Sequence, residues 1–437
     1  MKKITIIGTG YVGLVSGAGI SDFGHQVTCV DILEEKISYL NQGGIPFYEP
    51  GLKDLIERNV QSGRLLFSTE IERMIKNSEI IFIAVGTPEA EDGSADLTAI
   101  YSVADTIANN LNDYKVICTK STVPIGTGEK IVKSIRSKTD QTFDYCSNPE
   151  FLREGSAVRD FLRPDRIVLG ASSNNAIEVM KDIYRPLYIN ETPMLYTTIE
   201  SAEMIKYASN SFLALKISYI NEIANLCEAV NADVHTIARA MGIDGRISPK
   251  FLHAGPGFGG SCFPKDIKAL ASLAKMKKTP MHTIEGAIKA NELQKKRMID
   301  KLRFLLGGNF IGKHIAILGL TFKPETDDIR ESPAISMTEA ILKGGGKVSA
   351  YDPEGGTNFS KLFPDIIYEK SWEKAVSKSD GMVILTEWNE FRGIDANKIK
   401  TLMSAPVVLD TRNILNMHEF QNAGIIFDNV GRLPYKN

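Results

Sequence analysis

The stretch Ile4-Thr5-Ile6-Ile7-Gly8-Thr9-Gly10-Tyr11-Val12-Gly13 predicts a buried strand that turns sharply into a helix. In a G-x-G-x-x-G turn the first two glycines allow a tight bend and close approach of a pyrophosphate, and the third lets the helix pack on the strand. The next apolar run ends at Asp31, whose carboxylate can accept a ribose 2′-hydroxyl and would repel a 2′-phosphate. Residues 32–35 contain no arginine, so NAD is expected rather than NADP.

Short apolar runs alternate with helical patterns from residue 1 to about 195. Strands are predicted at 4–8, 27–31, 80–85, 116–121 and 167–170. This alternation predicts a doubly wound parallel sheet. A similar run at 313–320 begins a second unit of the same kind, with a helix at 335–342 and strands at 348–352, 383–386, 407–410 and 425–427.

An uninterrupted helical pattern separates the two sheet regions. Residues 199–230 contain neither glycine nor proline and repeat apolar residues at steps of three or four. A helix of about twice the usual length or more is expected to bridge domains and to offer a dimer face. Further helices are predicted at 266–274 and 283–306. The predicted fold class is α/β, with two Rossmann-like doubly wound sheet domains bridged by a long central helix and a helical region.

The composition limits the classes of partner. The 437 residues carry 51 basic and 53 acidic side chains, a formal charge of −2, so no global field favours nucleic acid or an anionic membrane. The N-terminus has no apolar signal segment and no run approaches a membrane span, so cytoplasmic location is expected. Five cysteines without a CxxC pair and six scattered histidines suggest a reducing compartment and no metal site.

One cysteine lacks an ordinary structural explanation. Cys29, Cys118 and Cys146 lie in strand-like runs and Cys227 in a helical one, where a thiol usually packs as a small core residue. Cys262 instead lies in a loop with four small residues, GFGGSCFPKD at 257–266, four positions before a carboxylate. A hydride acceptor together with a nucleophilic sulfur suggests oxidation through a thioester.

Other candidate residues lie where ligands of such sheets bind. Thr87 and Thr122 follow predicted strands beside prolines, although such loops are more often plain turns. Isolated cations near turns or strand ends could serve phosphates, although most arginines are surface charges. These cations are Arg246, Lys323, Arg330 and Arg412.

Two polar pairs have a spacing of four residues. Glu150 and Glu154 would share one face if their segment were helical, and the alternative is a solvated helix start with acids near its positive end. Lys206 and Asn210 have the same spacing on the long helix, where most such pairs are surface residues.

Taken together, these motifs resemble the UDP-glucose/GDP-mannose dehydrogenase family over essentially the whole chain. The resemblance rests on GTGYVG at 8–13, VGTP at 85–88, STVPIGT at 121–127, NPEFLREG at 148–155, the Lys206 to Asn210 helix, GFGGSCFPKD at 257–266 and GLTFKPETDDIRES at 319–332.

The resemblance implies three domains and a homodimer. Residues 1–198 would form the NAD-binding Rossmann domain, 199–300 the central helical dimerisation domain with the cysteine loop, and 301–437 the UDP-sugar-binding Rossmann-like domain. It also implies a four-electron reaction, in which UDP-glucose, two NAD and water give UDP-glucuronate and two NADH.

The resemblance also assigns roles. Asp266 and a water would assist removal of the C6 hydroxyl proton, Lys206 and Asn210 would stabilise the developing oxyanion, and Cys262 would attack the aldehyde. Glu150 and Glu154 would assist thioester hydrolysis, with their roles undivided, and Thr122 would orient that water or contact the cofactor. The implied cofactor-binding residues are Gly8, Gly10, Tyr11, Val12, Gly13, Asp31, Lys36, Thr87, Thr122, Glu154, Lys265 and Arg330. The implied substrate-binding residues are Phe151, Leu152, Lys206, Asn210, Arg246 (across the dimer), Phe251, Phe258, Gly259, Lys323 and Arg412.

Substrate specificity is the more open question. Relatives acting on UDP-N-acetyl sugars tend to carry His-Cys in the cysteine loop, so Ser261-Cys262 favours an unsubstituted hexose. UDP-glucose is preferred and GDP-mannose is the second choice, because Pro124 and the segment 48–52 look more like the UDP-glucose branch. A two-electron hydroxy-acid dehydrogenase and a catalytically silent NAD-binding regulator are the competing classes.

Overall fold

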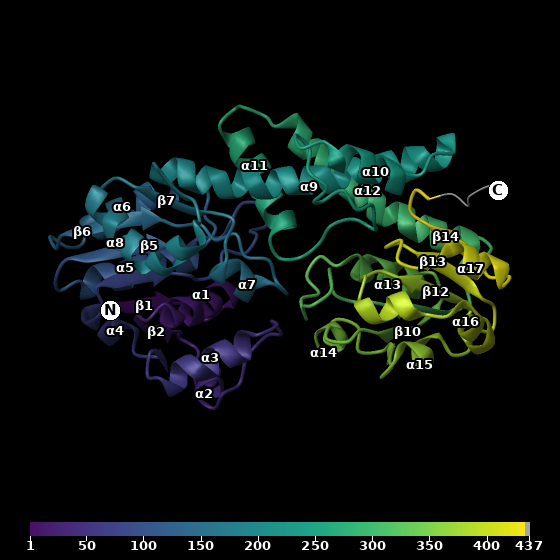
Figure 1. The fold of residues 1–437 in the computed structure, drawn as a ribbon, viewed down its shortest axis with the longest axis horizontal. Coiled ribbons are helices and arrows are strands. Elements are labelled where there is room, and N and C mark those ends of the chain that lie inside the picture. The colour runs from purple at the N-terminus through teal and green to yellow at the C-terminus, as the bar shows by residue number, and fades with distance from the viewer. Residues whose placement is uncertain (433–437) are drawn as a thin grey trace. The chain divides into compact units, whose positions relative to one another are not determined.

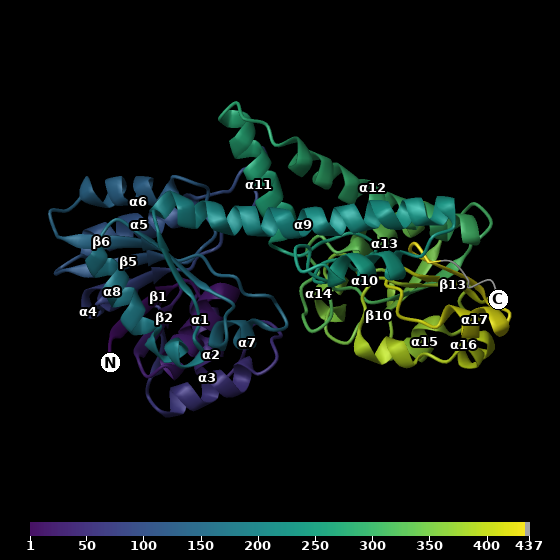
Figure 2. The same cartoon turned by 45° about the horizontal axis from the view of Figure 1, so that its top comes forward.

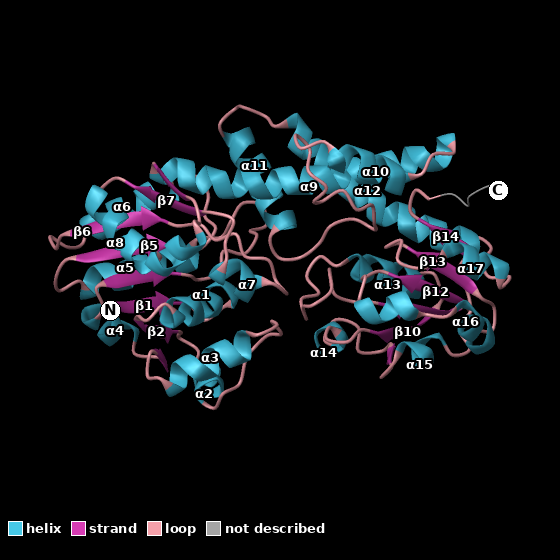
Figure 3. Cartoon of the chain, in the orientation of Figure 1, coloured by secondary structure: helices cyan, strands magenta, loops and turns pink. Residues whose placement is uncertain are grey.

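The computed structural model describes residues 1–432 and divides the chain into two compact units, Met1–Ser209 and Asn210–Asn437. Each unit contains one sheet with helices on both faces (Figures 1 and 3). No helix within residues 1–432 combines the length and the apolar character needed to span a bilayer.

The sheet of the first unit has eight strands in the order β3-β2-β1-β4-β5-β6-β7-β8. Its first six strands are parallel and follow the order of a dinucleotide-binding fold. This confirms the predicted doubly wound sheet. The strands are β1 (Lys3–Ile7), β2 (Gln26–Val30), β3 (Leu65–Ser68), β4 (Ile80–Ile83), β5 (Lys115–Thr119), β6 (Phe143–Ser147), β7 (Ile167–Ala171) and β8 (Met194–Thr197).

The last two strands depart from the parallel arrangement, because β8 pairs parallel with β7 and β7 is reversed. Strand β7 pairs with β6 in the antiparallel direction, with Cys146 opposite Ala171. The only helix between them, α7 (Ala157–Leu162), has six residues and spans roughly 9 Å, which is shorter than a five-residue strand. The chain therefore re-enters the sheet from the edge at which β6 ends, and the loop at 148–156 stays at the carboxyl ends of β5 and β6.

Two apolar cores cover the two faces of this sheet. Ile80 and Phe82 of β4 face one core, and Ile81 and Ile83 face the other, as alternation along a strand requires. The first core includes residues of α1 (Tyr11–Asp22), α2 (Glu34–Asn41), α3 (Leu52–Gln61), α7 and α8 (Asn174–Ile183). The second includes residues of α4 (Ile71–Asn77), α5 (Thr98–Asn110) and α6 (Thr127–Arg136). A 3-10 helix, η1 (Arg185–Asn190), precedes β8.

The second unit repeats the Rossmann strand order. Its sheet is parallel throughout, with the order β11-β10-β9-β12-β13-β14. The strands are β9 (His314–Leu318), β10 (Lys347–Tyr351), β11 (Ile367–Tyr368), β12 (Gly381–Ile384), β13 (Val407–Asp410) and β14 (Ile426–Asn429). The surrounding helices are α13 (Pro333–Lys343), α14 (Gly356–Ser360), α15 (Trp372–Val376), η2 (Asn389–Gly393), α16 (Ala396–Leu402) and α17 (Met417–Asn422).

A single helix, α9 (Ile199–Val230), is 32 residues long and matches the predicted range (Figure 2). The helices that follow are α10 (Val234–Ile243), α11 (Phe263–Met276) and α12 (His282–Leu305). Helix α12 lies along the second part of α9, where the Ser218 hydroxyl donates to the carbonyl of Ala287 at 2.8 Å and the Asn225 amide donates to Gln294 at 2.8 Å.

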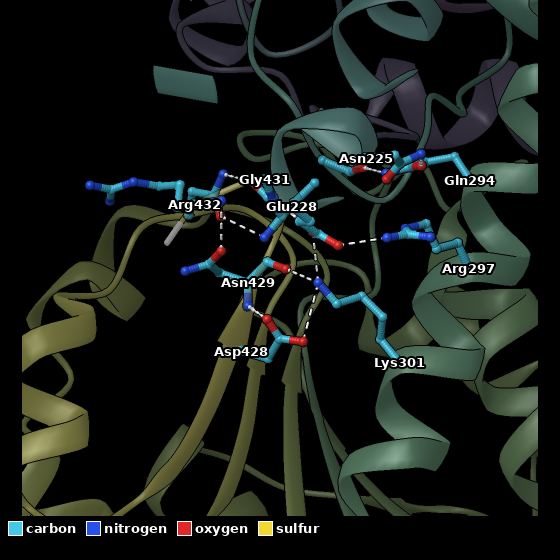
Figure 4. A network of polar contacts seen from close by, with 12 residues as sticks. Asn225, Glu228, Gln294, Arg297, Lys301, Asp428, Asn429, Gly431 and Arg432 are labelled. Carbon is cyan, nitrogen blue, oxygen red and sulfur yellow. Dashed lines mark hydrogen bonds and ion pairs between the residues drawn. The ribbon is translucent and has the colours of Figure 1, made fainter. Parts of the chain in front are cut away.

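A polar network fastens these helices to the last strand (Figure 4). The carboxylate of Glu228 on α9 pairs with Arg297 at 2.6 Å and Lys301 at 2.8 Å, and accepts from the backbone N–H of Gly431 at 2.9 Å. Lys301 also pairs with Asp428 of β14 at 3.2 Å. Burial disfavours the Glu228 carboxylate, but the contacts with these cations outweigh it and lower its pKa.

Candidate active site

The glycine-rich turn lies between β1 and α1, beside β4, where the strand order reverses. Gly8 has a φ of +105°, and a Cβ there would lie 2.7 Å from the carbonyl oxygen of Ala84. A Cβ on Gly13 would lie 1.9 Å from the Gly8 oxygen, so these two glycines make the turn and its packing. A Cβ on Gly10 would meet nothing within 4 Å. The open side of Gly10 is where a pyrophosphate can approach the start of α1, so the turn fits a dinucleotide.

Asp31 lies at the end of β2, beside this turn. Its carboxylate accepts from the Thr9 backbone N–H at 2.9 Å and hydroxyl at 2.7 Å, and pairs with Lys36 at 3.1 Å. Burial raises the pKa of Asp31, but these hydrogen bonds and the lysine outweigh it and leave the pKa lowered. Asp31 is therefore ionised at neutral pH, as an acceptor for a ribose hydroxyl must be.

The second unit uses the matching carboxylate differently. Asp352 follows β10 as Asp31 follows β2, but it accepts from the backbone N–H groups of Leu320 at 2.6 Å and Gly355 at 2.7 Å and from the Trp388 indole at 3.0 Å. Asp352 is itself buried. Asp352 thus stabilises the loops of its own unit. The glycine-rich turn and the aspartate typical of dinucleotide binding lie in the first unit.

The two threonine loops of the first unit are joined. The Thr87 hydroxyl donates to the carbonyl of Thr122 at 2.8 Å, so the structure brings these predicted residues together. Glu203 of α9 holds the end of the Thr122 loop, because its carboxylate accepts from the backbone N–H groups of Gly126 at 2.6 Å and Gly128 at 2.7 Å. Burial raises the pKa of Glu203 from 4.5 to about 7, although those N–H groups favour its charged form.

This raised pKa predicts a pH-dependent stability. Between pH 4.5 and about 7 the folded chain holds a proton on Glu203 that the unfolded chain has lost, so stability should fall as pH rises through this window and then level. Across this window the free energy of unfolding should fall by roughly 3 kcal/mol. Thermal unfolding at pH 5 and pH 8 should show a smaller pH effect in Glu203→Gln than in the wild-type protein. An equal pH effect in both proteins would contradict this assignment.

Glu150 and Lys206 form a buried ion pair. Their charged atoms are 2.9 Å apart, and the two side chains are 5% and 4% exposed. The surface interpretation of Lys206 is therefore wrong. Phe151 lies beside this pair, with the Lys206 ammonium 5.4 Å and the Arg166 guanidinium 3.8 Å from its ring centroid.

Glu150 and Glu154 do not share a helical face, because their segment does not meet the condition stated for it. Residues 148–156 are not helical, and α7 begins only at Ala157. Glu150 is buried, whereas Glu154 is half-buried and close enough to Tyr11 to contribute to raising its pKa, after burial and Glu49. Leu152 packs against the first core. The two carboxylates thus have different surroundings and are suited to different roles.

In the second unit, Cys262 lies immediately before α11 and is partly exposed, whereas Cys29, Cys118, Cys146 and Cys227 are buried, as predicted. The Cys262 carbonyl accepts from the N–H of Asp266 at 2.9 Å.

Asp266, one turn into α11, is itself buried. Its carboxylate accepts from the Asn210 amide at 2.7 Å and pairs with Lys265 at 2.7 Å. Asn210 is buried, so the surface interpretation of this residue is wrong as well.

The cysteine loop packs on the loop that follows β9. The N–H of Gly260 donates to the carbonyl of Arg330 at 2.8 Å, and a Cβ on Gly259 would lie 2.3 Å from the carbonyl oxygen of Glu331. The guanidinium of Arg412 donates to the carbonyls of Leu385 at 2.7 Å and Phe322 at 3.1 Å. These contacts gather Arg412, the Arg330 backbone and the cysteine loop at the carboxyl edge of the second sheet.

The remaining predicted residues are less closely grouped. Lys323 lies over the Phe322 ring at 5.4 Å, and the Arg330 guanidinium pairs with Asp328 at 2.7 Å. The Phe258 and Phe251 rings both lie near Phe263, at 6.2 and 6.0 Å. The Arg246 side chain is 89% exposed and pairs with Asp244 at 2.6 Å, so the structure does not bring it to the other candidates of its unit. Val12, in the first turn of α1, is half-buried.

Glu49 is a residue that sequence reasoning missed. It is buried, accepts a hydrogen bond from the Tyr11 phenol, and accepts from the N–H groups of Gly155 at 2.6 Å and Ala157 at 2.7 Å. The segment 48–52 was notable in the sequence, but nothing local in it indicated contacts this distant along the chain.

Known proteins match nearly the whole chain. Three models of the UDP-glucose/GDP-mannose dehydrogenase family cover it: the NAD binding domain matches residues 2–188, the central domain 200–293 and the UDP binding domain 316–417. UDP-glucose 6-dehydrogenase of Rhizobium meliloti (strain 1021) is 50% identical, covering 98% of this chain and 99% of its own. UDP-glucose 6-dehydrogenase TuaD of Bacillus subtilis (strain 168) is 47% identical, covering 99% and 94%.

A solved structure agrees. The UDP-glucose dehydrogenase from the archaeon Pyrobaculum islandicum matches with a TM-score of 0.93 and 34% identity, covering 99% of this chain and 98% of that one. Fold and site together define an NAD-dependent oxidoreductase. The chain belongs to the UDP-glucose/GDP-mannose dehydrogenase family.

Proposed function

We propose that this enzyme oxidises UDP-glucose at C6 to UDP-glucuronate, a four-electron reaction that uses two NAD and one water. The observation that carries the proposal is the placement of Cys262 immediately before α11, one turn from a buried Asp266 that also accepts from Asn210. The relatives named as UDP-glucose 6-dehydrogenases support the choice of sugar. The three predicted domains, 1–198, 199–300 and 301–437, are retained in this proposal.

The first oxidation converts the C6 hydroxyl to an aldehyde. Bound NAD supplies the acceptor for each hydride. Asp266, with a water, takes the hydroxyl proton, and the Lys206 ammonium and Asn210 amide stabilise the negative charge that develops on the oxygen. Lys206 and Asn210 are four residues apart on α9 and are proposed to act on the same substrate.

The second oxidation requires a nucleophile, because a bare aldehyde has no hydride that leaves readily. The Cys262 thiolate adds to the aldehyde carbon and gives a thiohemiacetal, which loses the second hydride and becomes a thioester. Cys262 lies at the start of α11, and helix starts in general favour negative charge. A water then attacks the thioester, its proton passes to a carboxylate, and Cys262 leaves as thiolate.

The two glutamates are proposed to serve that hydrolysis in different ways. Glu150 is held by Lys206, whereas half-buried Glu154 retains access to water, so we expect Glu154 to be the base. Glu154→Gln should let the acyl-enzyme accumulate, which intact-protein mass spectrometry would detect as an added UDP-glucuronyl group. Glu150→Gln is the matched variant on the same loop. Clean, unmodified protein from both variants during turnover would contradict the hydrolytic assignment.

Nucleotide binding is assigned to two sets of residues. Gly8, Gly10, Gly13 and Asp31 are proposed to hold NAD, with Tyr11, Val12, Lys36, Thr87, Thr122, Glu154, Lys265 and Arg330 as further contacts. The UDP-sugar is proposed to be surrounded by Phe151, Leu152, Arg246, Phe251, Phe258, Gly259, Lys323 and Arg412.

The proposed location is the cytoplasm, whose reducing conditions suit a thiolate nucleophile.

A homodimer is proposed through α9. Phe212, Tyr219 and Leu226 are 60%, 47% and 57% exposed and recur every seven residues, which places them on one face. Exposed aromatic and aliphatic side chains in a row are typical of an interface. Sedimentation of Phe212→Glu/Leu226→Glu should show monomers where the wild-type protein sediments as a dimer. A wild-type monomer, or an unchanged dimer in the variant, would contradict this interface.

The substrate is tested with a panel of nucleotide sugars. NADH absorbance should rise with UDP-glucose and much less with GDP-mannose or UDP-N-acetylhexosamines. A higher kcat/KM for GDP-mannose would replace the proposed substrate with the second candidate. Turnover of simple hydroxy acids, or NAD binding without turnover of any sugar, would favour the other two classes.

A further inference from the structure

A buried carboxylate links the coenzyme turn to the catalytic loop of the first unit. Glu49 lies between α2 and α3, and its residue is 6% exposed. It accepts three hydrogen bonds, from the Tyr11 phenol, from the Gly155 N–H at 2.6 Å and from the Ala157 N–H at 2.7 Å.

The partners of Glu49 come from two functionally distinct segments. Tyr11 is the first residue of α1, directly after the glycine-rich turn. Gly155 and Ala157 follow the loop with Glu150 and Glu154, and Gly155 is the neighbour of Glu154 in the chain. A movement of either segment relative to the other would therefore break a hydrogen bond to Glu49.

The chemistry of these contacts requires a carboxylate. All three partners are donors, and an ionised carboxylate offers acceptors on both oxygens. A glutamine would place an amide N–H against one of the donors and leave that donor unsatisfied. Tyr11 is fixed further by its ring, which lies 4.8 Å from the Phe47 ring.

Tyr11 is a constant donor. Burial, followed by the hydrogen bond to Glu49, raises the pKa of Tyr11 well above its ordinary value, so the phenol keeps its proton at any pH at which the enzyme works.

We infer that Glu49 is a positioning residue, which holds Glu154 and its loop in a fixed place relative to the coenzyme turn. The inference deepens the proposed function and rests on it. Loss of Glu49 should slow thioester hydrolysis, because the base is misplaced, and should weaken coenzyme binding, because Tyr11 loses its anchor. The steps before hydrolysis should proceed, since the proposed function assigns them to Cys262 and Asp266 and not to Glu154.

The test compares Glu49→Gln with the wild-type enzyme in rapid mixing and at steady state. We expect a burst of two NADH per subunit, a steady-state kcat lowered about tenfold or more, and an acyl-enzyme adduct by intact mass. Equilibrium titration with NADH should show an affinity lowered several-fold. Tyr11→Phe removes one contact of the three and should give the same changes, smaller in size.

Ser173→Ala is the matched control. Ser173 accepts from the Ala176 N–H at 3.2 Å at the start of α8 in the same unit, and its hydroxyl donates to Asp144 at 2.8 Å. Its loss therefore tests the effect of missing structural hydrogen bonds to residues that the mechanism does not use. This variant should lose some thermal stability while kcat per folded enzyme and NADH affinity stay at wild-type values.

Several outcomes would overturn the inference. One is a Glu49→Gln enzyme whose only change is a lowered Tm, as in the control. If Glu49→Gln fails to fold, Tyr11→Phe decides, and wild-type burst kinetics with wild-type NADH affinity in that variant overturn it. If the wild-type enzyme itself yields one NADH per sugar, the proposed function fails instead, and the NADH titration alone then decides whether Glu49 anchors the turn.

Discussion

Replacing Cys262 with alanine is expected to stop the formation of UDP-glucuronate, with a loss on the order of 10⁴-fold or more, as for other covalent nucleophiles. Without sulfur, the aldehyde forms no adduct from which the second hydride can leave. NADH absorbance and chromatography of the nucleotide sugars would measure the loss. Cys262→Ser should likewise form no thioester, because a hydroxyl is a far weaker nucleophile near neutral pH.

The other cysteines provide the control. Cys227→Ala changes a buried thiol on α9 that the mechanism does not use, and it should keep its activity while losing some stability. NADH binding by Cys262→Ala should persist, because the glycine-rich turn belongs to the first unit. A Cys262→Ala enzyme that still makes the acid with two NADH would refute covalent catalysis at this residue.

Replacing Lys206 with methionine is expected to affect both stability and rate. The change leaves Glu150 buried without its cation, which costs about 3–5 kcal/mol of unfolding free energy. It also removes the proposed oxyanion cation, which lowers kcat by about 10²–10³-fold. Denaturant unfolding and steady-state kinetics measure the two effects separately.

A double variant separates the two roles of Lys206. Lys206→Met/Glu150→Gln removes the buried charge together with its partner, so it should recover most of the lost stability and none of the lost rate. Recovery of the rate together with the stability would show that Lys206 only balances Glu150. A single Lys206→Met variant with wild-type stability would contradict the buried pair.

Much of the fold could be predicted because its signals are local. The range 199–230 of α9 followed from apolar spacing without a breaking residue, and the range 407–410 of β13 from a buried apolar run. Strands β3, β8 and β11 were not predicted. They have four residues or fewer, and β8 and β11 are largely half-buried or exposed, so no alternating pattern marks them. The antiparallel direction of β7 depends on how far α7 can carry the chain, which composition does not reveal.

The candidate site was likewise predictable only where its signals are local in the sequence. The glycine-rich turn and Asp31 were predictable, because turn, helix start and strand end are adjacent in sequence. The partners of Lys206 and Asn210 were not, since Glu150 and Asp266 each lie 56 positions away and only folding brings them together. Whether 148–155 is helical could not be decided from the sequence, because the segment is held by distant contacts, among them Glu49, which lies 106 positions from Gly155.

The central claim is that a sulfur-bound sugar carries the reaction through both oxidations. The most direct measurement is the amount of NADH formed from limiting UDP-glucose with excess NAD and wild-type enzyme. The account predicts two NADH for each UDP-glucose consumed, with UDP-glucuronate as the product. One NADH for each UDP-glucose, with the aldehyde released, would contradict it.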